Sequence, residues 1–376
     1  MAANTFQLSI DVLGWAAERA GTSIRDVASV VSKRPAAMLE GRFTLSQAEK
    51  FAQLTNVPFG YLFLKDTPAQ RPVPLPDFRN VQDNEALGPE FFDVYDDVVY
   101  KQEWFREYLT SVGAQPLSFV NQHPNEASPM RLAKAIFKDL KLALGFLREA
   151  STPETLYSYL AQCAENAGIL VFKNGVVGNN THRSLPVSQF RGFAIVDNLC
   201  PAVFVNGADA KSAWAFTLLH ELAHIWIGQS AVTDSAPKTN YATEALCNAA
   251  AAEILVPKKE FVVRWQNLEG SIKDKLEAQR LSFKVSSVVI ARRALDVGFI
   301  DRNWYLEIYH AARKVKNKSS GGNFYDTLGA RNGKRFSNTV ARLAYSGDLS
   351  LRHAGRLLNT SPSNVLNYHE RRAIPS

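Results

Sequence analysis

Residues 220–226 read HELAHIW, and this stretch constrains the fold of the chain more than any other. It lies within GADAKSAWAFTLLHELAHIWIG, residues 207–228, whose apolar spacing predicts a helix with Asp209 as its N-cap and Gly228 as its stop. We expect this helix to be buried, and in such a place imidazoles without partners would be costly. The apolar side chains that indicate burial are Leu218, Leu219, Leu222, Ile225 and Trp226.

Two histidines and a glutamate in this helix have the spacing of a metal hydrolase. Residues four apart stand on one face of a helix, so His220 and His224 can each give one nitrogen to a single Zn²⁺. The carboxylate of Glu221 can reach a water beside the metal and act as the general base. With seven His in 376 residues, chance would produce such a motif about 0.006 times per chain. A zinc site is therefore favoured over a helix with two stray histidines.

A catalytic zinc needs a third protein ligand, and the following segment TEALCNAAAAEILVP offers two glutamates. Glu244 lies twenty residues after His224, which leaves room for a turn and a returning antiparallel helix. Glu253 lies two and a half helical turns further on and points away from the face of Glu244. We predict Glu244 as the ligand, with Glu253 as its competitor.

Three short segments before this helix are rich in Val, Ile and Phe and are broken by Gly, Asn and Pro. GILVFKNGVV, FRGFAIVD and PAVFVNG therefore predict three strands of a small sheet. Helical spacing dominates elsewhere, including about 90–112, 130–150 and 153–167, the last with Thr152 as N-cap. The expected fold class is α+β, mostly α.

The first 66 residues read as short helices joined by tight turns. Their order suggests a helix-turn-helix module, with a small helical bundle as the alternative. KDTPAQRPVPLPDFRN, residues 65–80, has four prolines and indicates an extended connector. The predicted domains are a helix-turn-helix module (1–66), a Pro-rich linker (67–89), a helical connecting region (90–150), a core around the histidine helix (151–265) and a helical C-terminal region with a basic tail (266–376).

Composition excludes several classes of protein. No apolar run approaches the roughly 18 residues that span a bilayer, and the N-terminus lacks the pattern of a secretory signal. Cys163, Cys200 and Cys247 are odd in number and far apart, so they fit neither a disulfide framework nor a Cys-based zinc site. We expect a cytoplasmic protein that does not act on a membrane.

The net charge of +7 comes from one end of the chain. Residues 311–376 hold twelve Lys/Arg and three Asp/Glu, whereas the remaining 310 residues are slightly acidic. Within this tail, SLRHAGRLLNTSPSNVLNYHERR predicts two helices about a turn at 359–361. Phosphate contacts, an acidic protein partner or a solvated helix face would each explain the charge. The candidate contact residues are Arg352, Arg356, Arg371 and Arg372.

GNNTHR, residues 178–183, is a polar turn between strand-like segments. Its side chains could line a substrate cleft or stabilise an oxyanion, or they could cap a β-turn. The candidate substrate-binding residues are Asn179, Asn180, His182 and Arg183.

Taken together, FTLLHELAHIWIG and TEALCNAAAAEILVP resemble the ImmA/IrrE family of zinc metallopeptidases, in the long form with an N-terminal helix-turn-helix of the XRE type. GVVGNNTHRSL, FRGFAI and SSGGNFYDTLGARNGKRF also resemble long members, so the resemblance covers nearly the whole chain. The segment AAMLEGRFTLS keeps Glu40 and Gly41 of the helix-turn-helix signature but lacks its Trp and is shortened.

The resemblance implies a zincin-like core that binds zinc through His220, His224 and Glu244, with Glu221 as base. It also implies a regulatory endopeptidase that cleaves a repressor or another regulator protein. The rival interpretation is a regulator or antitoxin that binds DNA or a cognate toxin, with a peptidase site that is idle or conditionally active.

Overall fold

The computed structural model describes residues 5–55, 57–68, 87–233, 241–313 and 324–373. The chain divides into two compact units, residues 1–74 and 75–376, and each is described by itself. The predicted Pro-rich linker falls largely on residues 69–86, which lie outside the described residues.

The first unit is a set of short helices around a small apolar core. It contains β1 (Thr5–Gln7), α1 (Ile10–Arg19), α2 (Ile24–Val31), α3 (Ala36–Leu39), β2 (Arg42–Thr44), α4 (Leu45–Thr55) and a 3-10 turn at Phe59–Phe63. Ser23 caps α2 by accepting the N–H of Asp26. The antiparallel pair β1–β2 was not expected from the sequence. The helix-turn-helix assignment of this unit stays a prediction.

The second unit combines a small mixed sheet with many helices. Its strands are β3 (Leu170–Asn174), β4 (Val176–Val177), β5 (Asn180–Ser184), β6 (Gly192–Ile195), β7 (Ala202–Asn206) and β8 (Ala231–Thr233). Its first helices are α5 (Pro89–Ser111), α6 (Pro129–Asp139), α7 (Phe146–Glu149), α8 (Pro153–Asn166), α9 (Lys211–Ile227) and α10 (Tyr241–Leu255). The later helices are α11 (Lys258–Gln266), α12 (Ile272–Phe283), α13 (Ser287–Asp296), α14 (Arg302–Arg313), α15 (Phe324–Asn332), α16 (Lys334–Ser346), α17 (Leu351–Leu357) and α18 (Pro362–Ala373).

The main sheet has the strand order β3-β7-β6-β8, so all three predicted strand segments contribute to it. β7 pairs in parallel with β3, whereas β6 runs antiparallel to both β7 and β8. β4 and β5 form a separate hairpin. The fold is therefore α+β and mostly α, as the sequence predicts.

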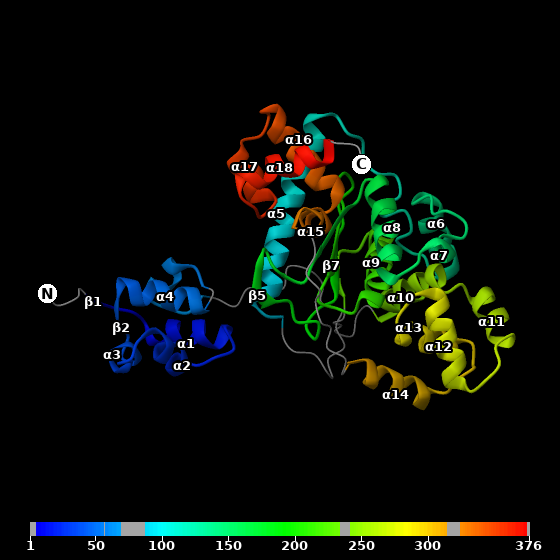
Figure 1. Ribbon diagram of the computed structural model, residues 1–376, viewed down its shortest axis with the longest axis horizontal. Coiled ribbons are helices and arrows are strands. Elements are labelled where there is room, and N and C mark those ends of the chain that lie inside the picture. Colours follow the sequence, from blue (N-terminus) through cyan, green and yellow to red (C-terminus); the bar gives the residue numbers. More distant parts are fainter. Residues whose placement is uncertain (1–4, 56, 69–86, 234–240, 314–323, 374–376) are drawn as a thin grey trace. The chain divides into compact units, whose positions relative to one another are not determined.

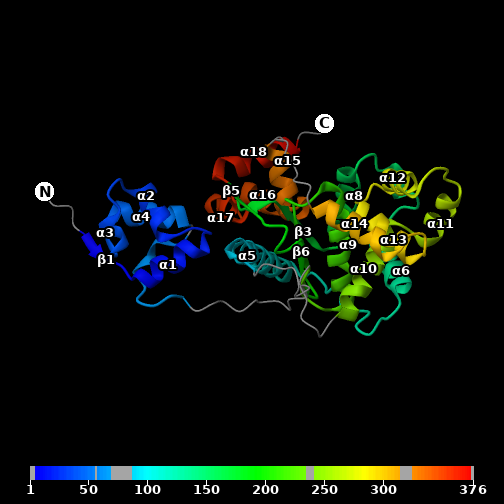
Figure 2. The same ribbon diagram turned by 90° about the horizontal axis from the view of Figure 1, so that it is seen from below.

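Side chains alternate between the two faces of the sheet, because successive residues of a strand point to opposite sides. One face packs on α8 and α9, with α10 behind α9, and the other packs on α5 and the C-terminal helices. We call them the α9 face and the α5 face (Figure 1). The view from below shows the same order, with α5 and α9 on opposite sides of the strands (Figure 2). The α9 face carries Val171, Ala194, Val203 and Val205. The α5 face carries Phe172, Phe193, Ala202 and Phe204.

α9 is the central helix of its face, and thirteen of its seventeen residues are buried. Gly228 ends it in the left-handed conformation with φ 80°, as the sequence predicts. The predicted N-cap is wrong: Ala210 holds that position and no side chain caps the helix. The carboxylate of Asp209 instead accepts a hydrogen bond from the guanidinium of Arg191 at 3.0 Å. This ion pair ties the turn before α9 to the start of β6.

Two further features refine the predicted elements. The helix expected over 130–150 is broken into α6 and α7, because the chain turns at Leu140–Gly145 with Lys141 and Gly145 at positive φ. Thr152 caps α8, and Pro153 begins it, as predicted. Within the described parts of the chain, no helix has both the length and the apolar character needed to cross a bilayer.

Candidate metal centre

His220, His224 and Glu244 bring three ligand atoms together between α9 and the first turn of α10. The Nε2 atoms of the histidines lie 3.1 Å apart. The carboxylate oxygens of Glu244 lie 3.1 Å from His220 Nε2 and 3.0 Å from His224 Nε2. Both imidazoles are buried, and 12% of the Glu244 side chain is exposed. These three residues form a group that could hold a metal ion.

The donor set fits a tetrahedral zinc ion. Zinc–ligand bonds of 2.0–2.1 Å place neighbouring ligand atoms about 3.3 Å apart in a tetrahedron, close to the spacing of these three atoms. Two neutral imidazole nitrogens this close repel each other unless a cation or a proton lies between them. The buried carboxylates of Glu221 and Glu244 also need compensating positive charge, which a divalent ion supplies.

The pKa values of His220, His224 and Glu244 indicate that, without a metal ion, this group holds one proton. Burial disfavours an imidazolium, yet the adjacent carboxylate of Glu244 raises the pKa of His220 to about 9. Burial lowers the pKa of His224, and the charge of His220 acts in the same direction. Although burial acts against it, the attraction of His220 holds the pKa of Glu244 well below its usual range. A metal ion would therefore displace one proton at neutral pH.

Glu221 is fully buried beside the ligands, between α9 and β6. Its charge contributes to the raised pKa of His220. Gly192 on β6 makes room for it: a Cβ there would lie 2.7 Å from Glu221 Oε1 and 2.8 Å from the carbonyl oxygen of Phe204. The sequence signal for this contact is a glycine inside an apolar strand, which marks a close approach.

Asn248 is a further residue of the candidate site to which the sequence reasoning gave no role. Its Oδ1 lies 3.0 Å from Nδ1 of His220. Nδ1 donates to this amide oxygen, which leaves Nε2 as the ligand atom. Asn248 follows Glu244 by four residues on α10, so the two side chains share one helix face. That spacing is the signal by which Asn248 could have been found.

Glu253 takes a different partner from Glu244. Its Oε2 accepts the guanidinium of Arg293 on α13 at 3.1 Å, and its Oε1 accepts the backbone N–H of Lys258 at 3.3 Å. These contacts join α10 to the helices that follow it. Of the two candidate third ligands, the structure brings Glu244 alone to the histidines.

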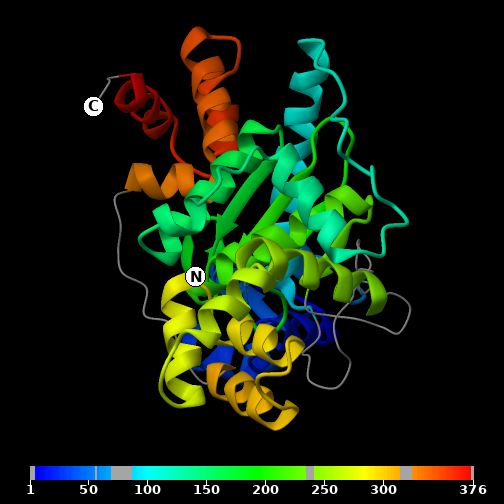
Figure 3. The same ribbon diagram turned by 90° about the vertical axis from the view of Figure 1, so that its right-hand side faces the viewer.

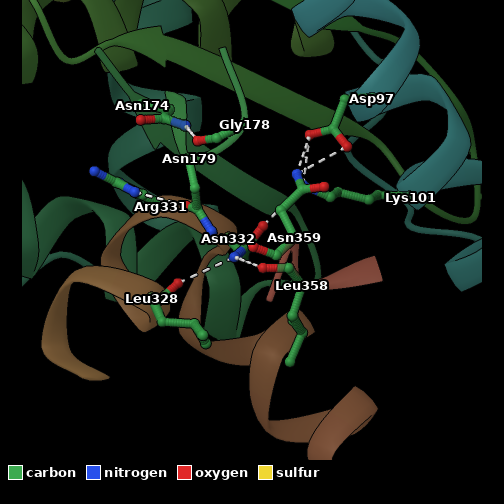
Figure 4. Close-up of polar contacts among 10 residues, drawn as sticks. All are labelled: Asp97, Lys101, Asn174, Gly178, Asn179, Leu328, Arg331, Asn332, Leu358 and Asn359. Atoms are coloured by element: carbon green, nitrogen blue, oxygen red, sulfur yellow. Dashed lines mark hydrogen bonds and ion pairs between the residues drawn. The ribbon is translucent and has the colours of Figure 1, made fainter. Parts of the chain in front are cut away.

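The predicted substrate-binding residues of the β4–β5 hairpin contact the α5 side of the unit and are not brought to the ligands. Arg183 donates to Asp93 at 2.7 Å and to Glu90 at 3.2 Å, both on α5. Asn179 donates to the carbonyl of Asn359 (Figure 4). His182 is exposed, and its backbone N–H donates to Asn180 Oδ1 at 3.0 Å. A substrate role for these residues stays a prediction.

The predicted basic contact residues lie on the last two helices. Arg352 and Arg356 are exposed on α17, and Arg371 is exposed on α18. The side chain of Arg372 lies outside the described residues.

Comparison with known families gives two matches within the second unit. Residues 164–295 match the profile of the IrrE N-terminal-like domain of a peptidase family, a range that holds the sheet, α9 and α10. Residues 332–371 match a domain of unknown function. No curated protein matches the chain. The first match supports the ImmA/IrrE resemblance and a peptidase activity.

Proposed function

We propose that the protein is a zinc-dependent endopeptidase that cleaves a specific regulator protein, such as a repressor. The observation that carries this proposal is the buried triangle of His220, His224 and Glu244 with Glu221 beside it. The match to a peptidase family over the same segment supports hydrolysis of a peptide bond. The motif resemblance to ImmA/IrrE peptidases supports a regulator as the substrate.

The chain's own residues supply binding and proton transfer. His220, His224 and Glu244 would hold the zinc ion, and Asn248 would keep His220 in the tautomer that ligates through Nε2. A bound zinc ion would polarise the scissile carbonyl and lower the pKa of the attacking water. Glu221 would accept a proton from that water and return it to the nitrogen of the leaving amine.

The experiment compares wild type with Glu221→Gln, which keeps the shape of the side chain and removes the base. Zinc content by elemental analysis and the unfolding temperature should match in the two proteins. Mass spectrometry of protein N-termini, in cells that produce either form, should show a new N-terminus with wild type only. We expect its rate of formation to fall by at least about 100-fold in the variant.

Two outcomes would contradict the proposal. Cleavage at the wild-type rate by Glu221→Gln would remove Glu221 from the mechanism. Equal zinc content without any N-terminus specific to wild type would favour the rival function, a binding regulator with an idle peptidase site.

A further inference from the structure

The last three helices form a compact bundle within the second unit, which we call the three-helix unit (residues 334–373). α16, α17 and α18 pack on one another. Figure 3 shows the orange and red helices of this region at one end, opposite the yellow helices α11–α13. The side chains that fill the interior of the three-helix unit are Phe336, Val340, Ala344, Ala354, Leu357, Leu358, Val365 and Tyr368.

The turn between α17 and α18 is short and sterically fixed. Asn359 adopts a left-handed conformation with φ 51°, and the N–H of Thr360 donates to the carbonyl of Gly355 at 2.8 Å. A Cβ on Gly355 would lie 2.7 Å from the carbonyl oxygen of Thr360, so only glycine permits this approach. Two helices joined by such a turn and packed on a preceding helix form a helix-turn-helix.

α5 holds this turn in place. The side-chain amide of Asn359 donates to both carboxylate oxygens of Asp97 at 3.1 Å (Figure 4). The hydroxyl of Tyr100 on α5 lies 3.0 Å from Nε2 of His353 on α17. The guanidinium carbon of Arg356 lies 4.7 Å from the centre of the Tyr100 ring. The three-helix unit is thus fixed on the core, and α18 keeps one face outward.

The outward face of α18 is polar. Val365 and Tyr368 point inward, whereas Ser363, Asn367 and Arg371 are exposed. Asn and Arg side chains are those that form bidentate contacts with adenine and guanine in the major groove, and Ser can contact either. None of the described side chains of α18 is an exposed large apolar one of the kind that anchors a protein–protein interface, although Tyr345 of α16, which is 61% exposed, stacks on His369 of α18.

The charge of the three-helix unit complements a polyanion. Residues 334–371 contain six Lys/Arg and two Asp/Glu. Arg352 and Arg356 are exposed along α17, the helix that crosses the phosphate backbone in a helix-turn-helix complex.

We propose that the three-helix unit binds double-stranded DNA, with α18 in the major groove and α17 on the phosphates. Ser363, Asn367 and Arg371 read base edges, whereas Arg352 and Arg356 fix the position of the unit on the duplex. Positive charge alone would suit an acidic protein equally well. The fixed turn and the polar outward face of α18 favour DNA.

The first experiment measures binding of the full chain to a labelled random-sequence duplex of about 30 base pairs across a series of salt concentrations. Arg352→Gln and Arg356→Gln should each weaken binding several-fold and reduce the salt slope by about 0.9. Arg148→Gln on α7 is the matched control, because its side chain is 80% exposed and lies outside the three-helix unit. Equal effects of all three substitutions, or none, would overturn the proposal.

The second experiment selects bound sequences from a randomised duplex library. Wild type should enrich one motif, and Asn367→Ala should lose the preference at part of it while binding random duplex within about twofold of wild type. Matching unfolding temperatures show that the variants fold. An absence of enrichment, an unchanged motif with Asn367→Ala, or competition by polyglutamate as strong as that by duplex DNA would each overturn the proposal.

Discussion

The two faces of the central sheet both bury charged groups, but they use them differently. On the α9 face, His220, His224 and Glu244 direct their ligand atoms at one another within about 3 Å. On the α5 face, Lys101 donates to Asp97 at 2.5 Å and to Asn332 Oδ1 at 2.8 Å (Figure 4). When the histidines are neutral, the group on the α9 face brings hydrogen-bond acceptors together. On the α5 face, the ammonium of Lys101 is instead matched by the acceptor oxygens of Asp97 and Asn332.

The Lys101 network on the α5 face is a structural contact, in contrast to the candidate metal site on the α9 face. Asn332 Nδ2 also donates to the carbonyls of Leu328 and Leu358, so the amide joins α15 to the turn after α17 (Figure 4). The cavity bordered by Lys101 and Asn332 has a volume of about 20 Å³, enough for one water. A satisfied network of this kind holds helices together. A convergent set of acceptors is instead a group that could hold a metal ion.

The difference between the two faces is tested most strongly by removing the carboxylate of Glu244 on the α9 face. Glu244→Ala should lower zinc affinity by at least about 100-fold, because it removes the charge that holds the cation. Elemental analysis after dialysis against a mild chelator measures the retained zinc. Glu253→Ala is the matched control and should keep the metal, since Glu253 pairs with Arg293. Loss of zinc from the control and retention in Glu244→Ala would exchange the roles of the two residues.

A pH-dependent stability should mark the place where α8, on the α9 face, meets α16 of the C-terminal helices. Glu165 of α8 is buried and accepts the N–H of Arg335 in the first turn of α16 at 3.0 Å, and burial raises its pKa to about 7. The folded protein therefore keeps this proton up to about pH 7, whereas the unfolded chain releases it near the ordinary value of 4.5. Stability falls as pH rises through this window and the loss is complete above pH 7.

Replacing Glu165 by glutamine isolates the contribution of this carboxyl group to the pH dependence of stability. Glu165→Gln should match wild type near pH 4.5 and exceed its free energy of unfolding by about 3 kcal/mol at pH 8. Denaturant unfolding at several pH values measures the difference. Glu103→Gln on α5, where the side chain is exposed, should show no such trend. A constant difference between Glu165→Gln and wild type across the pH range would contradict the assignment.

The smallest expected effect concerns Asn248, whose amide oxygen lies beside Nδ1 of His220. Asn248→Ala should lower zinc affinity by about tenfold without removing a ligand, because His220 loses the acceptor that fixes its tautomer. Asn248→Asp keeps an acceptor oxygen at this position and should restore much of the affinity. A competition titration with a chelator measures both. If alanine and aspartate lower the affinity equally, the role of Asn248 is in packing.

The sequence predicted the core of the candidate site because the relevant distances are local. A four-residue spacing on one helix fixes the His220–His224 relation, and apolar neighbours fix the burial of that helix. Gly228 and Pro257 predicted where α9 and α10 stop, because Gly adopts the left-handed conformation that ends a helix and Pro cannot continue one. The N-cap of α9 was missed because Asp209 is used by Arg191, a residue eighteen positions away.

What the sequence determined by itself is the local arrangement: the helical histidine pair, the adjacent glutamate, the three strand segments and the basic charge of the C-terminal end. Tertiary structure decided which distant groups meet. It brought Glu244 to the histidines and paired Glu253 with Arg293. It also placed Asn248 beside Nδ1 of His220 and joined the 178–183 segment to α5. The physical reason is that helix and strand periodicity fix relations over a few residues. Relations between elements depend on how their apolar faces pack on the two sides of the sheet.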